Sequence, residues 1–194
     1  MNIVQIGANN GKDHVFDFIK DNYDHLTLAI FIEPIPFVID DLKKQYQEFN
    51  DKIHIENIAI SHEKDIENMT LYYLEGSNYE VTSFSKEHVI IHNPPQFNYP
   101  VEEMKVPCLT FNEVMEKYNL TELDYLYIDT EGLDVYIISS IDFTKYNIKN
   151  IIFEFTHTDG AFRVGENFHQ TKYYLQQLGY TVSPLDSLNA IAKK

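Results

Sequence analysis

The stretch Ile3-Val4-Gln5-Ile6-Gly7-Ala8-Asn9-Asn10-Gly11-Lys12-Asp13 decides the fold of this 194-residue chain. It predicts an apolar strand that runs into a glycine-punctuated turn and then into a helix. Gly7 and Gly11 allow a tight turn and a close approach of the backbone to a ligand. Asn9 or Asn10 holds a positive φ at modest cost. The stretch therefore indicates a ligand site at the end of the first strand.

A second strand pattern follows at 28–33 and ends in the carboxylate of Glu33. Glu33 lies about 20 residues beyond the turn, where a dinucleotide-type fold places a carboxylate on the ribose hydroxyls. Pro34 and Pro36 separate this strand from the next helical pattern. Turn and carboxylate together predict a site for a nucleotide-type cofactor.

Composition limits the class of protein. With 194 residues and 44% hydrophobic residues, we expect one domain over 1–194. The net charge of -15 disfavours nucleic acid and anionic membranes as partners. One cysteine, Cys108, excludes an internal disulfide framework, and no apolar run approaches a membrane span. We therefore predict a soluble, cytoplasmic protein.

Strand and helix patterns alternate, as in a parallel sheet covered on both faces. Residues 180–183 and 189–192 predict a final antiparallel pair, and Gly179 the end of the helix before it. The other strand patterns lie at 2–6, 28–33, 53–60, 123–129 and 150–155, and the helical patterns at 15–19, 37–46, 111–118, 135–140 and 166–178.

The stretch 62–105 breaks the alternation. We interpret it as an insertion of short antiparallel pieces and a long loop, forming a lobe on the acceptor side. Its aromatic residues suit either stacking on a ring or a small core of the insertion. Asn112 is a candidate cap for the helix that follows.

The turn also bears on the choice of cofactor. A dinucleotide places its pyrophosphate at a helix N-terminus, where Asp13 would repel it. S-adenosylmethionine has no phosphate and carries a cationic sulfonium, which suits an acidic pocket. The turn also lacks the third glycine of the dinucleotide fingerprint. A tight turn without a ligand is the plain structural alternative.

Taken in order, the motifs resemble the FkbM-type methyltransferases. The resemblance covers residues 2 to about 157, and its blocks are Gln5-Ile6-Gly7-Ala8-Asn9-Asn10-Gly11, Glu33-Pro34, Asn57-Ile58-Ala59-Ile60-Ser61, Val106-Pro107-Cys108-Leu109-Thr110, Tyr127-Ile128-Asp129-Thr130-Glu131-Gly132 and Ile152-Phe153-Glu154.

The resemblance implies an α/β class I methyltransferase fold: a mostly parallel seven-stranded sheet with helices on both faces and a C-terminal antiparallel pair. It implies S-adenosylmethionine as donor and O-methylation of a small molecule or sugar. Gln5 departs from the family's frequent aspartate, and Tyr127 from its frequent lysine. Family members often carry elements before the first strand that help to cover the cofactor. Because this chain begins at its first strand, we expect that cover to come from the insertion or from another subunit, as in a homo-oligomer.

Carried over residue by residue, the resemblance predicts the cofactor site. Glu33 would hold the ribose, Ala59 and Ser61 would border the adenine, and Asp129 would hold the cofactor amino group or orient the acceptor hydroxyl. Asp129 could instead cap the helix that starts near Gly132. The remaining cofactor-binding candidates are Gln5, Gly7, Asn9, Gly11 and Glu131.

His157, Asp129 and Glu154 are the catalytic candidates. His157 follows the fifth strand and suits the removal of a hydroxyl proton, although a surface or capping histidine is the plainer interpretation. We predict no resident metal, and a divalent ion on His157 and the carboxylates is the less favoured alternative. His88 and His92 have a spacing suited to zinc, but we interpret them as two unrelated histidines.

The sequence therefore predicts an S-adenosylmethionine-dependent O-methyltransferase. A nicotinamide-dependent oxidoreductase on a related open sheet and a methyltransferase-like binding module without turnover are the alternatives. Cofactor binding separates the first two functions, and consumption of the methyl donor separates enzyme from module.

Overall fold

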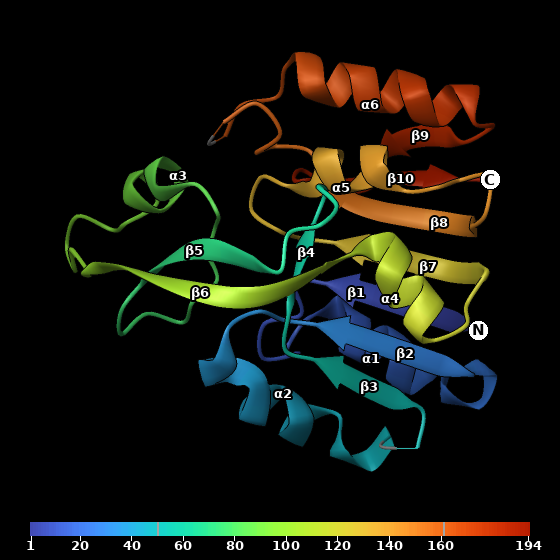
Figure 1. Cartoon of the computed structure of the whole chain (residues 1–194), viewed down its shortest axis with the longest axis horizontal. Coiled ribbons are helices and arrows are strands. Elements are labelled where there is room, and N and C mark those ends of the chain that lie inside the picture. The colour runs from blue at the N-terminus through green and yellow to red at the C-terminus, as the bar shows by residue number, and fades with distance from the viewer. Residues whose placement is uncertain (50, 161) are drawn as a thin grey trace.

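A seven-stranded sheet forms the centre of the computed structural model, which describes residues 1–49, 51–160 and 162–194 (Figure 1). The strand order is β3-β2-β1-β7-β8-β10-β9. The first five are parallel, whereas β10 runs antiparallel to both β8 and β9. This confirms the predicted fold class and the final antiparallel pair. The strands are β1 (Asn2–Ile6), β2 (Leu28–Ile32), β3 (Ile53–Glu56), β7 (Glu122–Ile128), β8 (Asn147–Glu154), β9 (Thr181–Pro184) and β10 (Asn189–Lys193).

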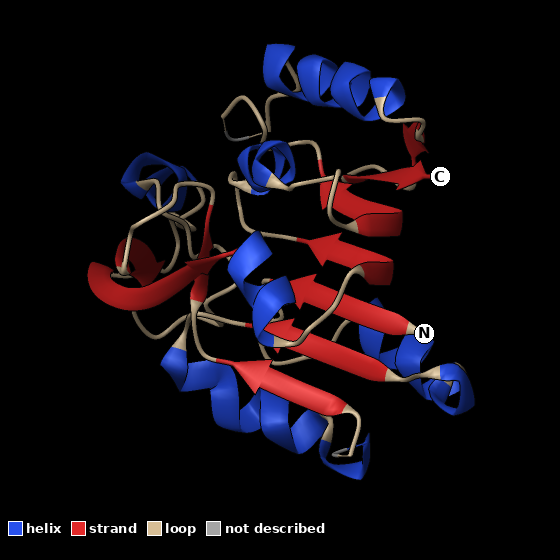
Figure 2. Cartoon of the chain, turned by 45° about the vertical axis from the view of Figure 1, so that its right-hand side comes forward, coloured by secondary structure: helices blue, strands red, loops and turns tan. Residues whose placement is uncertain are grey.

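Helices cover both faces of this sheet (Figure 2). Strand alternation sends the two faces of β1 into separate cores, because Ile3 packs on one side and Val4 on the other. The Val4 side holds α4 (Phe111–Lys117), α5 (Asp134–Ser140) and α6 (Glu166–Gln177), and the Ile3 side holds α1 (His14–Asp21) and α2 (Ile39–Gln45). Short 3-10 turns occupy Tyr23–His25, Pro36–Val38 and Gln47–Phe49.

A second, smaller sheet lies beside the carboxyl ends of the parallel strands (Figure 1). Its order is β4 (Ala59–Ser61), β6 (Val101–Thr110) and β5 (Asn68–Leu74). The predicted strand 53–60 is therefore wrong in one respect, since its two halves join different sheets. The chain leaves the first sheet at Asn57, whose side chain donates to the carbonyls of Glu33 and Pro34 at 2.8 and 3.1 Å.

The 62–105 stretch contains the predicted antiparallel pairing, but its strands are longer than the expected short pieces and its loop includes a helix. β5 and β6 pair antiparallel over seven residues, from Asn68 opposite Pro107 to Leu74 opposite Val101. Between them lies a helix, α3 (Lys86–Ile91), capped by the Ser85 side chain. The helical pattern of this segment is too short to stand out from its loop in the sequence.

Thr110, rather than the predicted Asn112, caps α4. The Thr110 hydroxyl accepts from the backbone of Glu113, whose carboxylate accepts from the Thr110 backbone in return. Asn112 instead donates to the Ser140 carbonyl at 3.0 Å. Threonine and asparagine are both good N-cap residues, so only the observed start of α4 at Phe111 shows which of the two is the cap.

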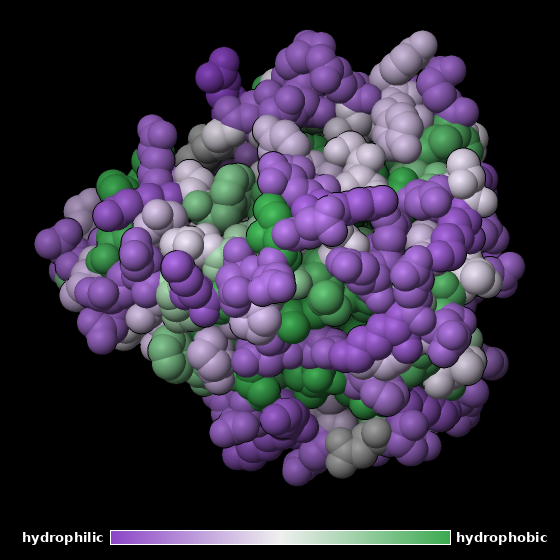
Figure 3. All heavy atoms as spheres, in the orientation of Figure 1, coloured by the Kyte–Doolittle hydropathy of each residue, from purple (hydrophilic) through white to green (hydrophobic). Residues whose placement is uncertain are grey.

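Hydrophilic side chains cover most of the face shown in Figure 3, with apolar side chains in smaller areas between them. This distribution fits a chain with a net charge of -15. Among the described residues, no helix is both long enough and apolar enough to cross a membrane.

Candidate functional site

A cavity of about 300 Å³ lies at the carboxyl ends of β1, β2 and β7. Gly7, Glu33 and Asp129 each directly follow one of these strands and line it. The strand order reverses between β1 and β7, and ligands of open parallel sheets bind at such a reversal. The topology thus brings together three residues that lie far apart in the sequence.

Gly7 lets two strand ends come together. Its φ is +81°, and a Cβ atom there would lie 1.8 Å from the carbonyl oxygen of Asp129. The amide of Gly7 donates to the Ile32 carbonyl at 2.9 Å, and that of Asp129 donates to the Ile6 carbonyl at 3.0 Å. Any side chain at position 7 would push β1 and β7 apart at the mouth of the cavity.

Glu33 is fixed by the turn after β1. Its two carboxylate oxygens accept from the amides of Asn9, at 2.7 Å, and Ile35, at 2.8 Å. Asn9 has a φ of +43°, as expected for one of the two asparagines. Burial raises the pKa of Glu33 to about 7, although both hydrogen bonds act to lower it. A buried carboxylate with one partner on each oxygen keeps lone pairs for ligand hydroxyls.

The N-terminus of α1 is occupied by its own cap. Oδ1 of Asp13 accepts from the amides of Val15 at 2.9 Å and Phe16 at 3.3 Å, and Oδ2 accepts from the Gln5 side chain at 2.6 Å. These amides are the donors that a pyrophosphate would need. The start of α1 therefore does not suit a dinucleotide.

Asp129 lines the first cavity, and its side chain is open to solvent there although many protein atoms surround it. Burial raises its pKa well above the usual range, and the neighbouring carboxylates of Asp134 and Glu131 raise it further. Such a group is stabilised in its charged form by a bound cation. This end of the cavity is suited to a ligand with positive charge.

Asp134 holds the loop after β7 and was not singled out from the sequence. It is fully buried, and its Oδ2 accepts from the amide and hydroxyl of Thr130. Its Oδ1 accepts from the Glu154 amide at 3.1 Å, which ties the ends of β7 and β8 together. Burial raises the pKa of Asp134 to about 7. As the first residue of α5 it holds Thr130, while Asp129 stays directed to the cavity.

A second cavity, of about 710 Å³, adjoins the first. Phe84 and Glu131 line both. The second cavity is bounded by α3, by the start of α5 and by the segment after β8, so the insertion supplies one wall. Its volume lies in the range typical of small-molecule sites. The polar side chains around it include His88, Tyr136, His157, Arg163 and Asn167.

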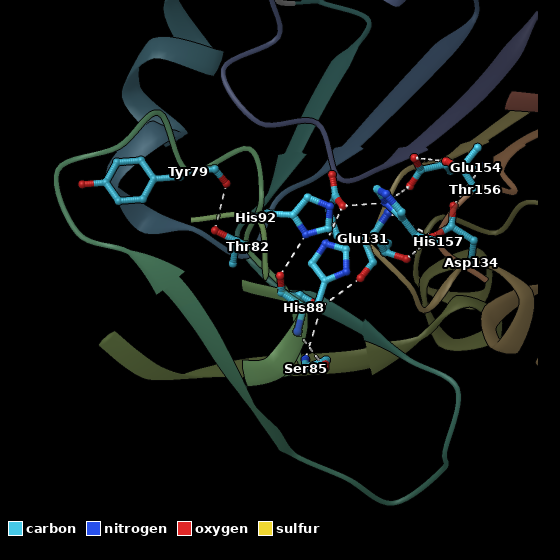
Figure 4. A network of polar contacts seen from close by, with 12 residues as sticks. Tyr79, Thr82, Ser85, His88, His92, Glu131, Asp134, Glu154, Thr156 and His157 are labelled. Carbon is cyan, nitrogen blue, oxygen red and sulfur yellow. Dashed lines mark hydrogen bonds and ion pairs between the residues drawn. The ribbon is translucent and has the colours of Figure 1, made fainter. Parts of the chain in front are cut away.

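Glu131 joins two histidines at the border of the cavities (Figure 4). Its Oε2 lies 2.8 Å from Nε2 of His88 and 3.1 Å from Nδ1 of His157. Burial opposes the charge of Glu131, but the hydrogen bonds with His157 and His88 outweigh it and lower its pKa to about 2. Glu131 has a φ of +52°, and the Ser83 hydroxyl donates to its carbonyl at 2.8 Å.

Glu154 lies behind His157 and not on either cavity wall. Its Oε2 is 3.1 Å from Nδ1 of His157, and its Oε1 accepts from the Thr156 hydroxyl at 2.9 Å. The hydrogen bond to Glu131 raises the pKa of His157, partly offset by burial, and the charge of Glu154 raises it further. Two carboxylates thus hold one imidazole by the same nitrogen.

His88 and His92 are not unrelated, and the structure corrects that interpretation. They lie one turn apart at α3, with ring centroids 4.2 Å from each other and each 5.0 Å from that of His157. Nδ1 of His92 lies 2.8 Å from the His88 carbonyl. The spacing of four residues between His88 and His92 was the signal available in the sequence for a shared site. Only the fold brings His157, which follows β8, beside α3.

Three of the residues expected at the cofactor do not line the first cavity. Gln5 is buried and bonded to Asp13, and the Ser61 hydroxyl donates to the Glu63 carbonyl at 2.9 Å. A Cβ on Gly11 would meet Leu42 and Tyr46, so Gly11 serves the packing of the turn. The expected residues that do line it are Gly7, Asn9, Glu33, Ala59, Asp129 and Glu131.

The insertion covers the first cavity with aromatic side chains. Tyr79 and Phe84 line it, and the Tyr79 ring packs against Phe37 and Tyr73, with centroids 5.4 and 5.9 Å away. The Asn9 side chain donates to the Asn78 carbonyl at 3.4 Å. Of the aromatic residues of the insertion, these two are the ones placed to contact a ligand there.

Comparison with protein families finds one match over most of the chain. The methyltransferase FkbM domain matches residues 5–182. A search of curated proteins finds no match.

The search of solved structures finds similar chains at low sequence identity, and the first of those described here shares the fold. An FkbM methyltransferase from Methylobacillus flagellatus is 11% identical with a TM-score of 0.54, over 100% of this chain and 43% of that one. TrmK of M. capricolum, bound to S-adenosylhomocysteine, is 11% identical with a TM-score of 0.49, over 100% of this chain and 62% of that one. The fibrillarin pre-rRNA processing protein of Methanococcus jannaschii is 16% identical with a TM-score of 0.48, over 99% of this chain and 65% of that one. The chain thus spans less than two thirds of the length of each.

Proposed function

The chain belongs to the FkbM methyltransferase family, whose methyl donor is S-adenosylmethionine, and we propose that it methylates a hydroxyl of a small molecule or sugar. The observation that carries this proposal is the pair of adjoining cavities with Glu131 on the border of both. A donor in one cavity and an acceptor in the other would meet beside His157.

The first cavity fits S-adenosylmethionine. Glu33 has lone pairs for the ribose hydroxyls, and the apolar side chains of Ile35, Leu71 and Leu133 line the same cavity around Ala59, as an adenine requires. Asp129 lies among other carboxylates, where a cationic ammonium and sulfonium are favoured. When bound, the cofactor supplies an electrophilic methyl group.

The second cavity suits an acceptor. Positioning the acceptor oxygen near the methyl carbon contributes much of the rate of such a displacement. The negative charge of the chain disfavours a polyanion such as RNA. Arg163 is the single arginine of the sequence and lines this cavity, so acceptors with a carboxylate belong in any panel.

His157 removes the hydroxyl proton in this proposal. Because Nδ1 faces the carboxylates of Glu131 and Glu154, Nε2 is the nitrogen left to accept a proton, and it has no hydrogen-bond partner among the described residues. The ring of Phe162 packs beside it, 4.9 Å between centroids, and 71% of Phe162 is exposed. Acceptor entry would displace this exposed ring. Glu131 and Glu154 act by positioning His157.

The capped start of α1 argues against the nicotinamide alternative. Asp13 already occupies the amides that would bind a pyrophosphate, and its charge would repel one. Calorimetric titration with S-adenosylmethionine and NADH tests this directly. Tight NADH binding without a response to S-adenosylmethionine would overturn the proposal.

Turnover is tested by incubating the chain with S-adenosylmethionine and hydroxylated acceptors, including neutral sugars, carboxylated sugars, phenols and an RNA arm. We expect release of S-adenosylhomocysteine and a methylated small molecule in mass spectra. Methylation of RNA alone would overturn the acceptor class. Cofactor binding with no turnover across the panel would favour the binding-module alternative.

A further inference from the structure

We propose that His88, His92 and His157 form a binding site for a divalent transition-metal ion such as zinc, and that the bound ion blocks His157. Each imidazole offers one nitrogen, and the three nitrogens lie within 4.8 Å of one another. His88 and His92 come from α3 in the insertion, whereas His157 follows β8 of the main sheet. The site therefore exists only in the folded chain.

Two of the imidazoles are oriented as metal ligands usually are. Nδ1 of His92 is held by the His88 carbonyl at 2.8 Å, and Nδ1 of His157 by the carboxylates of Glu131 and Glu154, each at 3.1 Å. Metal-binding histidines commonly donate one ring N–H to a carbonyl or carboxylate and present the other nitrogen to the ion. Here the nitrogen left in each case is Nε2.

These two Nε2 atoms are buried, and neither has a hydrogen-bond partner among the described residues. His157 is only 9% exposed, so its unpartnered nitrogen is removed from water. A buried nitrogen without a partner costs free energy that a ligand would recover. Figure 4 shows the three imidazoles gathered around the Glu131 carboxylate.

A transition-metal ion such as zinc fits this site better than magnesium or calcium. Neutral imidazole is a good ligand for zinc, copper and nickel, whereas magnesium and calcium prefer oxygen ligands. Three nitrogens on a tetrahedral zinc ion, at Zn–N of about 2.0–2.1 Å, lie about 3.4 Å apart. The present separations of up to 4.8 Å require at most about 1.4 Å of closure, within the reach of side-chain rotation. Glu131, already 2.8 Å from His88, keeps a negative charge beside the ion.

The consequence for activity rests on the proposed function. If Nε2 of His157 accepts the proton of the acceptor, an ion on that nitrogen prevents the transfer. Zinc should then inhibit methyl transfer and leave the first cavity, where the donor binds, intact. His92 lies outside both cavity walls, so it can be changed without touching either ligand.

The test measures metal binding separately from catalysis. Zinc titration of the full chain in a calorimeter, with cobalt absorption spectra as a second readout, is compared between wild type, His92→Ala and His25→Ala. His25 is an exposed histidine far from α3 and serves as the matched control. We expect one ion per chain, an affinity lowered about 100-fold in His92→Ala, and no change in His25→Ala. Absence of binding, or equal affinity in all three, would overturn the site.

Methyl transfer is then measured with and without zinc. Zinc should inhibit the wild type reversibly, with activity restored by EDTA, while His92→Ala should keep its basal turnover and lose most of its sensitivity. Activation by zinc would overturn the inhibitory role. Zinc binding without turnover on any acceptor would leave the metal site standing and count against the proposed function, so the two failures are distinguishable.

Discussion

Oε2 of Glu131 lies 3.1 Å from Nδ1 of His157, at the border between the two cavities. This contact assigns the ring proton to Nδ1 and leaves the lone pair on Nε2 in the neutral imidazole. It also connects the cavity proposed for the cofactor with the cavity proposed for the acceptor, because Glu131 lines both.

Replacing His157 with alanine should lower turnover about 10²- to 10⁴-fold, because a general base contributes about that much. Cofactor affinity should change little, since His157 does not line the first cavity. Single-turnover rates and calorimetric titration measure the two effects, with His25→Ala as the control. A variant that retains more than about a tenth of the wild-type turnover would remove His157 from the mechanism.

The dependence of kcat/KM on pH should reflect the Glu131 contact. Only neutral His157 accepts a proton, so the rate should rise with pH, and the raised pKa of His157 places this rise above the ordinary histidine value of about 6.5. Glu131→Gln removes the charge that favours the imidazolium and should shift the rise to lower pH. Identical profiles for the two proteins would show that Glu131 does not set this pKa.

Affinity for S-adenosylmethionine should depend on the ionisation of Glu33. Burial raises its pKa to about 7, so the carboxyl is protonated below that pH and becomes the better acceptor for ribose hydroxyls above it. The dissociation constant should therefore fall as pH rises through about 7. Glu33→Gln should bind about 10- to 100-fold more weakly and lack this step. Calorimetric titration across this pH range measures the dissociation constants of both proteins. A wild-type affinity independent of pH would contradict the assignment of Glu33 to the ribose.

Gly7→Ala should destabilise the fold by about 1–3 kcal/mol more than Gly160→Ala. Both glycines have positive φ, at +81° and +113°, so the conformational cost is shared. At position 7 the new Cβ meets backbone, 1.8 Å from the Asp129 carbonyl oxygen, whereas at position 160 no atom of the described residues beyond the chain neighbours lies within 4 Å. Urea unfolding measures the difference. Equal midpoints would mean that the strand ends relax without cost.

Cofactor binding should slow hydrogen exchange over residues 78–84. This segment lines the first cavity through Tyr79 and Phe84, and hydrogen bonds of Asn78 and Ser83 attach it to the loops after β1 and β7. A ligand that contacts both sides reduces local opening. Exchange of β5 and β6, which pair over seven residues, serves as the internal control. Equal protection with and without S-adenosylmethionine would show that the segment is a fixed part of the wall.

The sequence alone determined the main sheet and several of the residues that line the first cavity. Periodicity over short segments reports which residues are buried, so the strands of the main sheet and most of the helices could be predicted without knowledge of their neighbours. Gly7, Asn9 and Glu33 could be identified because the turn and the carboxylate lie at a spacing that the fold itself imposes. Gly11 belongs to the same turn, yet whether it faces the ligand or Tyr46 depends on α2.

Tertiary structure decided everything that depends on contacts between distant segments. Whether a strand stays in its sheet is settled by hydrogen bonds to other strands, which is why 53–60 divided at Asn57. The same holds for the border of the two cavities, where α3 brings His88 and His92 to Glu131 and His157. Sequence spacing shows that two histidines share a helix face, but only the packing of the insertion on the main sheet places a third beside them.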